Sequence, residues 1–176
     1  MPPTARPNFL VVSALVPYKR VDLAMMAARR AGVGLIVVGN GPERQRLEKL
    51  TGDGVALVGW RPDEDIRELY RSSVAAILPG EEDFGIVPVE AQATGRPVVA
   101  LGRGGALDTV IDGETGILVP DATVESLADG LTRAANTTWH PARIRAHAER
   151  FSRERFVSEI RDIVDDTLNA PAGQQW

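Results

Sequence analysis

Residues 74–100 read VAAILPGEEDFGIVPVEAQATGRPVVA, and they contain two apolar runs joined by a polar loop and an amphipathic segment. The runs lie at 74–78 and 97–100, and apolar residues return every three or four positions over 87–94. Continuous apolar runs are typical of strands buried on both faces, whereas the longer spacing predicts a helix. We therefore expect a strand, a loop, a helix and a second, parallel strand.

The same alternation extends on both sides of this unit. Further apolar runs predict strands, and the segments between them have helical spacing. Connections between parallel strands are almost always right-handed crossovers, so the sequence predicts an α/β fold with a doubly wound parallel sheet of about six strands. Ligands of such sheets bind beyond the carboxyl ends of the strands. The other predicted strands are 9–14, 35–38, 55–58 and 116–119, and the other predicted helices between strands are 21–31, 43–50 and 63–72.

The chain after residue 120 contains helical patterns only, at 124–135, 141–150 and 153–168. We expect these extra C-terminal helices to cover an edge or one face of the sheet. The ends, 1–8 and 169–176, lack any period and are expected to be disordered. One Rossmann-like domain at 9–168 is the resulting prediction.

Composition excludes several functions. The formal net charge is -4, so no basic field is available for nucleic acid. The chain has no cysteine, which excludes disulfides, thiolate catalysis and sulfur-bound zinc, and which fits a cytoplasmic location. The arginines at 143–155 are interpreted as a solvated face, with a weak contact to a membrane surface or a partner domain as the alternative.

The acidic loop at 79–91 carries the clearest chemical signal. Glu82 lies on the loop, and Glu90 falls in the second turn of the predicted helix, where we expect it to be partly buried with a fixed partner. Carboxylates accept hydrogen bonds from vicinal hydroxyls, whereas the Gly85 and Ile86 amides at the helix start favour a phosphate. The layout matches a nucleoside diphosphate sugar in a single crevice.

A basic pair, Lys19 and Arg20, follows the first strand and can face the Glu82 loop, because the first and fourth strands are neighbours in this topology. Two cations there would neutralise a diphosphate. An ordinary exposed pair before a helix is the alternative.

Two glycine-rich turns also follow strands. Gly39 and Gly41 let a ligand approach the backbone, but Arg44 stands where a dinucleotide fingerprint needs a third glycine, which weakens a dehydrogenase interpretation. Gly104 and Gly105 would present amides to the same crevice. Plain tight turns explain both segments nearly as well.

Together these motifs resemble a known family. Glu82 and Glu90 in EDFGIVPVEA, followed by GRPVV at 95–99, are similar to the signature of GT-B retaining glycosyltransferases of family 4. With 12–20, 38–44 and 104–108 added, the chain resembles the branch of bacterial and archaeal mannosyltransferases of O-antigen and capsule synthesis. The resemblance runs from about residue 9 to 168.

The resemblance implies a donor-binding domain that needs no metal and no other cofactor. It assigns Glu82 to the donor sugar, Glu90 to the ribose hydroxyls and Lys19 to the diphosphate. Ala14 stands where many members carry Arg, so a second cation would come from Arg20. The catalytic residues expected are Glu82 and Lys19, and the substrate-binding residues are Glu90, Phe84, Gly85, Ile86, Val87, Arg20, Gly39, Gly41, Trp60, Arg61, Gly104 and Gly105.

Family members have a second, N-terminal domain that binds the acceptor, and no part of this sequence corresponds to it. The expected activity is therefore hexosyl transfer, from GDP-mannose or a related donor, once that missing domain is present. The alternative is a non-catalytic nucleotide-binding or regulatory module. An epimerase or phosphorylase of the same architecture would need an acid/base set that the sequence does not offer.

Overall fold

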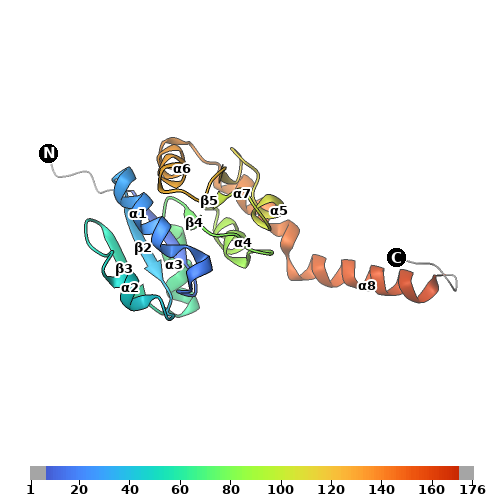
Figure 1. Ribbon diagram of the computed structural model, residues 1–176. Coiled ribbons are helices and arrows are strands. Elements are labelled where there is room, and N and C mark those ends of the chain that lie inside the picture. The colour runs from blue at the N-terminus through green and yellow to red at the C-terminus, as the bar shows by residue number, and fades with distance from the viewer. Residues whose placement is uncertain (1–6, 171–176) are drawn as a thin grey trace.

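The computed structural model describes residues 7–170 and contains one six-stranded parallel sheet (Figure 1). The strand order is β3-β2-β1-β4-β5-β6, and each neighbouring pair is parallel. The predicted doubly wound α/β fold is confirmed. The strands are β1 (Asn8–Val12), β2 (Gly34–Val38), β3 (Val55–Gly59), β4 (Ala76–Leu78), β5 (Val98–Leu101) and β6 (Gly116–Val119).

Helices cover both faces of this sheet, and each face has its own core. Phe9 and Val11 of β1 point into one core and Leu10 into the other, as the two-residue period of a strand requires. Helices α1 and α6 pack on the first core, and α3, α4 and α5 on the second. The helices are α1 (Val21–Ala31), α2 (Arg44–Glu48), α3 (Asp63–Ser72), α4 (Ile86–Ala93), α5 (Ala106–Thr109), α6 (Val124–Asn136), α7 (Pro141–Ala148) and α8 (Arg153–Asn169), with 3-10 turns η1 (Pro17–Lys19) and η2 (Glu149–Phe151).

The order of strands places a crevice between β1 and β4. The chain leaves β1 toward α1 on one face, and it leaves β4 toward α4 on the opposite face. Connections that diverge in this way leave the carboxyl ends of the two strands uncovered. The loops that follow β1 and β4 therefore border one opening.

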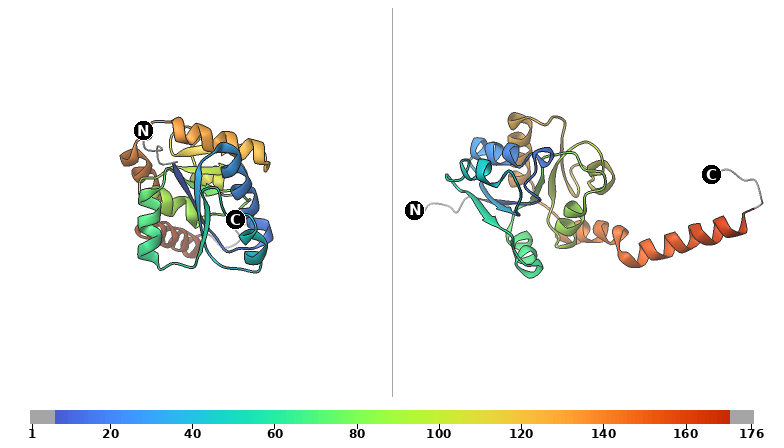
Figure 2. Two further views of the ribbon diagram at one scale, coloured as in Figure 1. Left: turned by 90° about the vertical axis from the view of Figure 1, so that its left-hand side faces the viewer. Right: turned by 60° about the horizontal axis from the view of Figure 1, so that its bottom comes forward.

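The C-terminal helices differ from one another in packing. Helix α6 lies against α1 and the sheet, and α7 lies against α4. Helix α8 projects away from the body, as Figures 1 and 2 show, and none of its residues is buried. The expectation that all three cover the sheet is wrong for α8, because its apolar residues form a stripe for which residues 7–170 provide no counterpart.

The expected ends of the domain also shift. Asn8 is the first residue of β1, and Asn169 is the last residue of α8, so neither belongs to an irregular tail. Residues 7 and 170 are described and lie outside the helices and strands, and the remaining residues expected to be disordered, 1–6 and 171–176, lie outside the described residues.

Candidate functional site

The loops after β1 and β4 meet through close backbone contact and one ion pair. A Cβ atom added at Gly80 would lie 2.5 Å from the Tyr18 carbonyl oxygen, so only glycine allows the two loops to approach this far. Lys19 Nζ donates to Glu82 Oε1, and the two side chains are 19% and 17% exposed. The sequence-based expectation that Lys19 faces the Glu82 loop is confirmed.

A cavity of about 550 Å³ opens beside this ion pair. The amino end of α4 closes one side of it, with Gly85 as the N-cap residue at φ 79°. The first amides of an α-helix have no intrahelical acceptor, and the helix dipole makes this end electropositive. The residues that line the cavity are Val12, Ser13, Ala14, Tyr18, Lys19, Glu82, Phe84, Gly85, Ile86 and Val87.

Glu90 lies in the second turn of α4, as expected, and borders a second cavity of about 630 Å³ between α3 and α4. Its Oε2 accepts a hydrogen bond of 3.1 Å from the Tyr70 hydroxyl. Burial, reinforced by the Glu90 charge and by this hydrogen bond, raises the pKa of Tyr70 above its ordinary value. The phenol is therefore a permanent donor toward Glu90 at neutral pH.

Two details of the expected crevice are wrong. Glu82 and Glu90 line two cavities rather than one, and these cavities share Val12 at the end of β1. Glu90 is exposed rather than partly buried, although it has the fixed partner that was expected. The reason is that Glu82 precedes α4, whereas Glu90 sits one turn inside it, on the side that faces α3.

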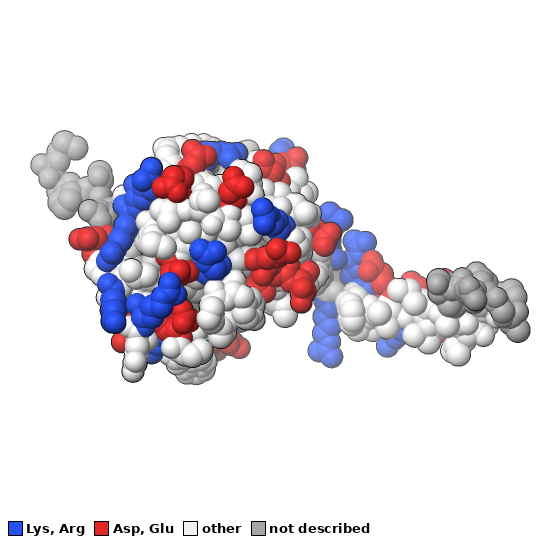
Figure 3. Space-filling model, in the orientation of Figure 1, with Lys and Arg blue, Asp and Glu red and all other residues white. Residues whose placement is uncertain are grey.

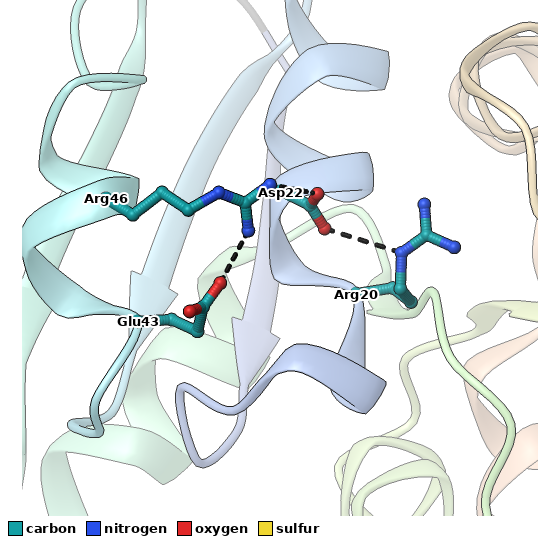
Figure 4. A network of polar contacts seen from close by, with 4 residues as sticks. All are labelled: Arg20, Asp22, Glu43 and Arg46. Atoms are coloured by element: carbon teal, nitrogen blue, oxygen red, sulfur yellow. Dashed lines mark hydrogen bonds and ion pairs between the residues drawn. The ribbon is translucent and has the colours of Figure 1, made fainter.

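Arg20 does not join Lys19 in the cavity. Its Nε lies 3.6 Å from Asp22 Oδ1, and Figure 4 shows this carboxylate also contacting Arg46, which in turn reaches Glu43. The network connects the start of α1 to α2. In this structure Arg20 is part of a helix–helix contact, and among the described residues 7–170 Lys19 alone supplies side-chain positive charge to the cavity lining.

Four of the five predicted glycines, those of the two glycine-rich turns, support the loops, whereas Gly85 lines the first cavity. A Cβ atom at Gly39 would lie 1.8 Å from Ser13 O, and one at Gly104 would lie 2.3 Å from Glu82 O. The Gly105 amide donates to Glu82 O at 2.7 Å, which anchors the loop that carries this carboxylate. Gly41 packs against the Leu15 backbone in the same manner.

Trp60 and Arg61 lie just past β3, outside the lining of the two cavities. The Trp60 side chain is 68% exposed, and Arg61 Nη1 donates to its carbonyl oxygen at 3.0 Å. They stand at the carboxyl edge of the sheet between β3 and α3, and Arg61 lines a third cavity, of about 380 Å³, together with residues of α3 that do not line the Glu90 cavity.

Two contacts escaped the sequence analysis. The sequence predicts only that Tyr70 lies on an amphipathic helix, because nothing in its spacing shows that its hydroxyl reaches α4. Phe84 packs edge-to-face on Phe151, with ring centroids 5.9 Å apart, and so ties the site loop to η2. The Tyr70–Glu90 contact bridges one crossover, and the Phe84–Phe151 contact joins residues that are far apart in the sequence.

The charged side chains on the face drawn in Figure 3 do not create a strong electrostatic field of one sign. Basic and acidic side chains are interspersed on the face drawn in Figure 3. Within 143–155, Arg145 donates to the Ala93 carbonyl oxygen and Arg155 pairs with Glu159. Residues 7–170 hold no group of three or more His, Asp or Glu suited to a metal, and no helix among them is long and apolar enough to cross a membrane.

Comparison with known proteins identifies the family. The model of the family described as "Glycosyl transferases group 1" matches residues 2–151. This chain belongs to the glycosyl transferases group 1 family. The match covers all six strands, both cavities and the Lys19–Glu82 pair. This family match sets the dehydrogenase interpretation aside.

Relatives share this domain but are longer. A D-inositol 3-phosphate glycosyltransferase of Acidothermus cellulolyticus is 34% identical over 183 residues, which cover 90% of this chain and 41% of that protein. The sucrose-phosphate synthase of Thermosynechococcus elongatus superposes with a TM-score of 0.78 and 28% identity, over 94% of this chain and 46% of its own. HepE of Anabaena, solved with UDP and glucose, superposes with a TM-score of 0.74 and 27% identity, over 93% of this chain and 48% of its own. The chain thus spans less than half the length of each.

Proposed function

We propose that this chain is the donor-binding half of a retaining glycosyltransferase and that a nucleoside diphosphate sugar lies across its two cavities. The observation that carries the proposal is the Lys19–Glu82 ion pair beside the amino end of α4. A cation, a carboxylate and helix amides around one cavity offer partners to a diphosphate and to sugar hydroxyls together.

The diphosphate is assigned to Lys19 and the start of α4. A lysine has three N–H donors, and one of them on Glu82 leaves two for phosphate oxygens. The amides of Ile86 and Val87 would hold the opposite side of the same group. Negative charge grows on the diphosphate as its bond to the sugar breaks, so donors already in place stabilise the transition state. Because Lys19 and the helix supply this positive charge, we propose that no metal is required.

Glu82 is assigned to the donor sugar. It lies just before the amino end of α4 and next to Lys19, where a sugar attached to the bound diphosphate would lie. Its carboxylate would accept hydrogen bonds from hydroxyls of the sugar and favour positive charge at the reacting carbon. Retention is proposed from the family 4 resemblance of the Glu82–Glu90 motif.

Glu90 is assigned to the ribose, in the cavity that shares Val12 with the first one. The base would then extend toward Trp60 and Arg61 at the end of β3. Volumes of about 550 and 630 Å³ fall in the usual range for ligand sites. An elongated donor can occupy both.

GDP-mannose is our preferred donor, because the motifs resemble the mannosyltransferase branch. The HepE structure holds UDP and glucose, which makes UDP-glucose the first alternative. We assign the enzyme to polysaccharide synthesis on the same resemblance and to the cytoplasm because a chain without cysteine fits a reducing compartment, with any peripheral membrane contact left to the full-length protein.

Transfer itself is proposed to need the rest of a longer protein, which would hold the acceptor. The chain spans 41% of its inositol-phosphate relative, and α8 exposes Phe156, Ile163 and Leu168 at 63%, 59% and 78%. Large apolar residues on one helix are typical of a face that another part of a protein covers. A non-catalytic nucleotide-binding module remains the second candidate if the natural protein has no such part.

A thermal-shift panel tests the proposal. The 176-residue chain is melted with GDP-mannose, UDP-glucose, UDP-N-acetylglucosamine or NAD. A ligand at about 100 times its Kd stabilises by ~2.7 kcal/mol, which raises the Tm by roughly 5–10 °C. We expect one nucleotide sugar to do so and Glu90→Ala to weaken its binding. A shift with NAD alone, or unchanged affinity in Glu90→Ala, would overturn the assignment.

A further inference from the structure

Tyr70 and Glu90 form a contact in which a buried group holds an exposed one. Tyr70 is 2% exposed and lies in the last turn of α3, whereas Glu90 is exposed on α4. The hydroxyl donates to Oε2 at 3.1 Å. Within residues 7–170 no Lys or Arg forms an ion pair with Glu90, although Arg67, Arg71 and Arg145 line the same cavity.

We propose that Tyr70 is a positioning residue that fixes Oε2 of Glu90, leaves Oε1 for a ribose hydroxyl, and thereby sets the preference of the site for ribonucleotides. The inference rests on the proposed function, because it takes Glu90 as the ribose partner. It adds a residue to the site that touches no ligand itself.

The physical basis is the freedom of a glutamate side chain. An exposed Glu populates many rotamers, and fixing it on a ligand costs conformational entropy comparable in size to the gain from one hydrogen bond. A donor on a rigid, buried ring restricts those rotamers before the ligand arrives. Without the hydroxyl, ribose binding would have to fix the side chain by itself.

A competing effect works in the opposite direction. The phenol withdraws electron density from the carboxylate and occupies one acceptor position. An ionised carboxylate offers about four acceptor positions, so three remain for a ribose diol. The carboxylate therefore keeps enough acceptor positions for both ribose hydroxyls while its orientation is fixed.

The burial of Tyr70 makes this orientation durable. Its ring packs with Leu10, Ala76 and Ala91 in the core on the α3–α4 face of the sheet. The phenol stays protonated through the neutral range, because burial and the Glu90 charge raise its pKa. Its position is set by the core rather than by the ligand.

The test compares ligands with and without the ribose hydroxyls. Calorimetry on the full chain measures UDP and GDP against their 2′,3′-dideoxy forms, for wild type, Tyr70→Phe, Glu90→Gln and Ser73→Ala. Ser73→Ala is the matched control, because Ser73 is a 2% exposed residue of the same helix end whose hydroxyl donates to Leu69 O at 2.7 Å. Thermal melts of each variant verify folding.

We expect Tyr70→Phe to weaken the ribonucleotide about five- to tenfold and to leave the dideoxy form within about twofold, so the ratio of the two affinities falls. Glu90→Gln lowers that ratio further, and Ser73→Ala leaves it unchanged. A merely structural role of Tyr70 would weaken both ligands equally.

Two contrary outcomes are distinguishable. If Glu90→Gln lowers the ratio and Tyr70→Phe does not, the positioning role is wrong while the proposed function stands. If wild type binds neither diphosphate, or Glu90→Gln leaves the ratio unchanged, the ribose assignment fails and the inference fails with it.

Discussion

The two cavities at the carboxyl edge of the sheet hold their carboxylates in different ways. Glu82 is largely buried and pairs with a cation, Lys19, whereas Glu90 is exposed and is held by a neutral phenol. A cation partner suits a cavity that must also attract a diphosphate. A neutral donor leaves the charge of Glu90 available to hydroxyls. The charges at this edge of the sheet thus distinguish a phosphate side, at Lys19 and Glu82, from a ribose side, at Glu90.

Removal of Lys19 should have the largest effect on this division. Lys19→Ala takes away the cationic side chain that the described part of the chain contributes to the first cavity lining, and it removes the ion-pair partner of Glu82. Charge-assisted contacts contribute about 1.5–3 kcal/mol, so we expect diphosphate affinity to fall roughly 10- to 100-fold in calorimetry. Lys49→Ala is the matched control, because Lys49 is the other lysine of the chain and lies exposed after α2. Equal affinities of the two variants would contradict the phosphate assignment.

A side chain added at Gly105 should disturb the cavity lined by Lys19 and Glu82 more than the cavity bordered by Glu90. A Cβ atom there would lie 2.4 Å from Phe84 O and 2.5 Å from Asp83 O, so the site loop must move. We expect Gly105→Ala to cost about 1–3 kcal/mol of stability and to weaken diphosphate binding. Gly113→Ala meets no atom within 4 Å, although its φ of 78° is strained, and should lower stability alone. Similar affinities of the two variants would show that the loop contact is unimportant.

The loss of stability at alkaline pH tests the Tyr70–Glu90 contact without a ligand. The pKa of Tyr70 is raised in the folded state, so its contribution to stability is complete below the unfolded value of about 10 and is lost as pH rises above it. Above pH 10, we expect urea titrations to show wild type losing up to about 1.4 kcal/mol per pH unit more than Tyr70→Phe. Tyr18→Phe changes a phenol that is 64% exposed and should follow wild type. An equal loss of stability with rising pH in wild type and Tyr70→Phe would contradict the conclusion that the folded protein keeps the Tyr70 phenol protonated.

The smallest effect is expected at Arg20. Its guanidinium faces Asp22 and does not line either cavity, although its sequence position next to Lys19 suggests a phosphate contact. We expect Arg20→Ala to change diphosphate affinity less than about threefold, which is the scale of an exposed ion pair. A loss as large as that of Lys19→Ala would mean that Arg20 turns into the cavity when a ligand binds.

The sequence predicts the fold well because buried parallel strands are written as continuous apolar runs. All six runs, from 9–14 to 116–119, correspond to strands, and the Lys19 and Glu82 loops meet because the topology brings β1 and β4 together. Helix α8 shows where this reasoning stops. Its apolar period predicts a helix correctly, but a period does not identify the surface that covers it.

The site is predicted in part for a related reason. Spacing places Glu90 in the second turn of α4, yet its partner Tyr70 lies 20 residues earlier, across a crossover. The predicted glycines are needed for close backbone approach, and a one-dimensional pattern does not tell whether the approaching backbone belongs to a ligand or, as at Gly39 and Gly104, to another loop. Tertiary contacts between distant segments decide both matters.

The central claim is that one nucleoside diphosphate spans both cavities. A crystal structure of the chain with UDP or GDP tests it most directly. We predict phosphate oxygens within hydrogen-bonding distance of Lys19 Nζ and the Ile86 amide, with a ribose hydroxyl on Glu90 Oε1. A nucleotide bound elsewhere, or bound with its ribose away from α3 and α4, would contradict the account.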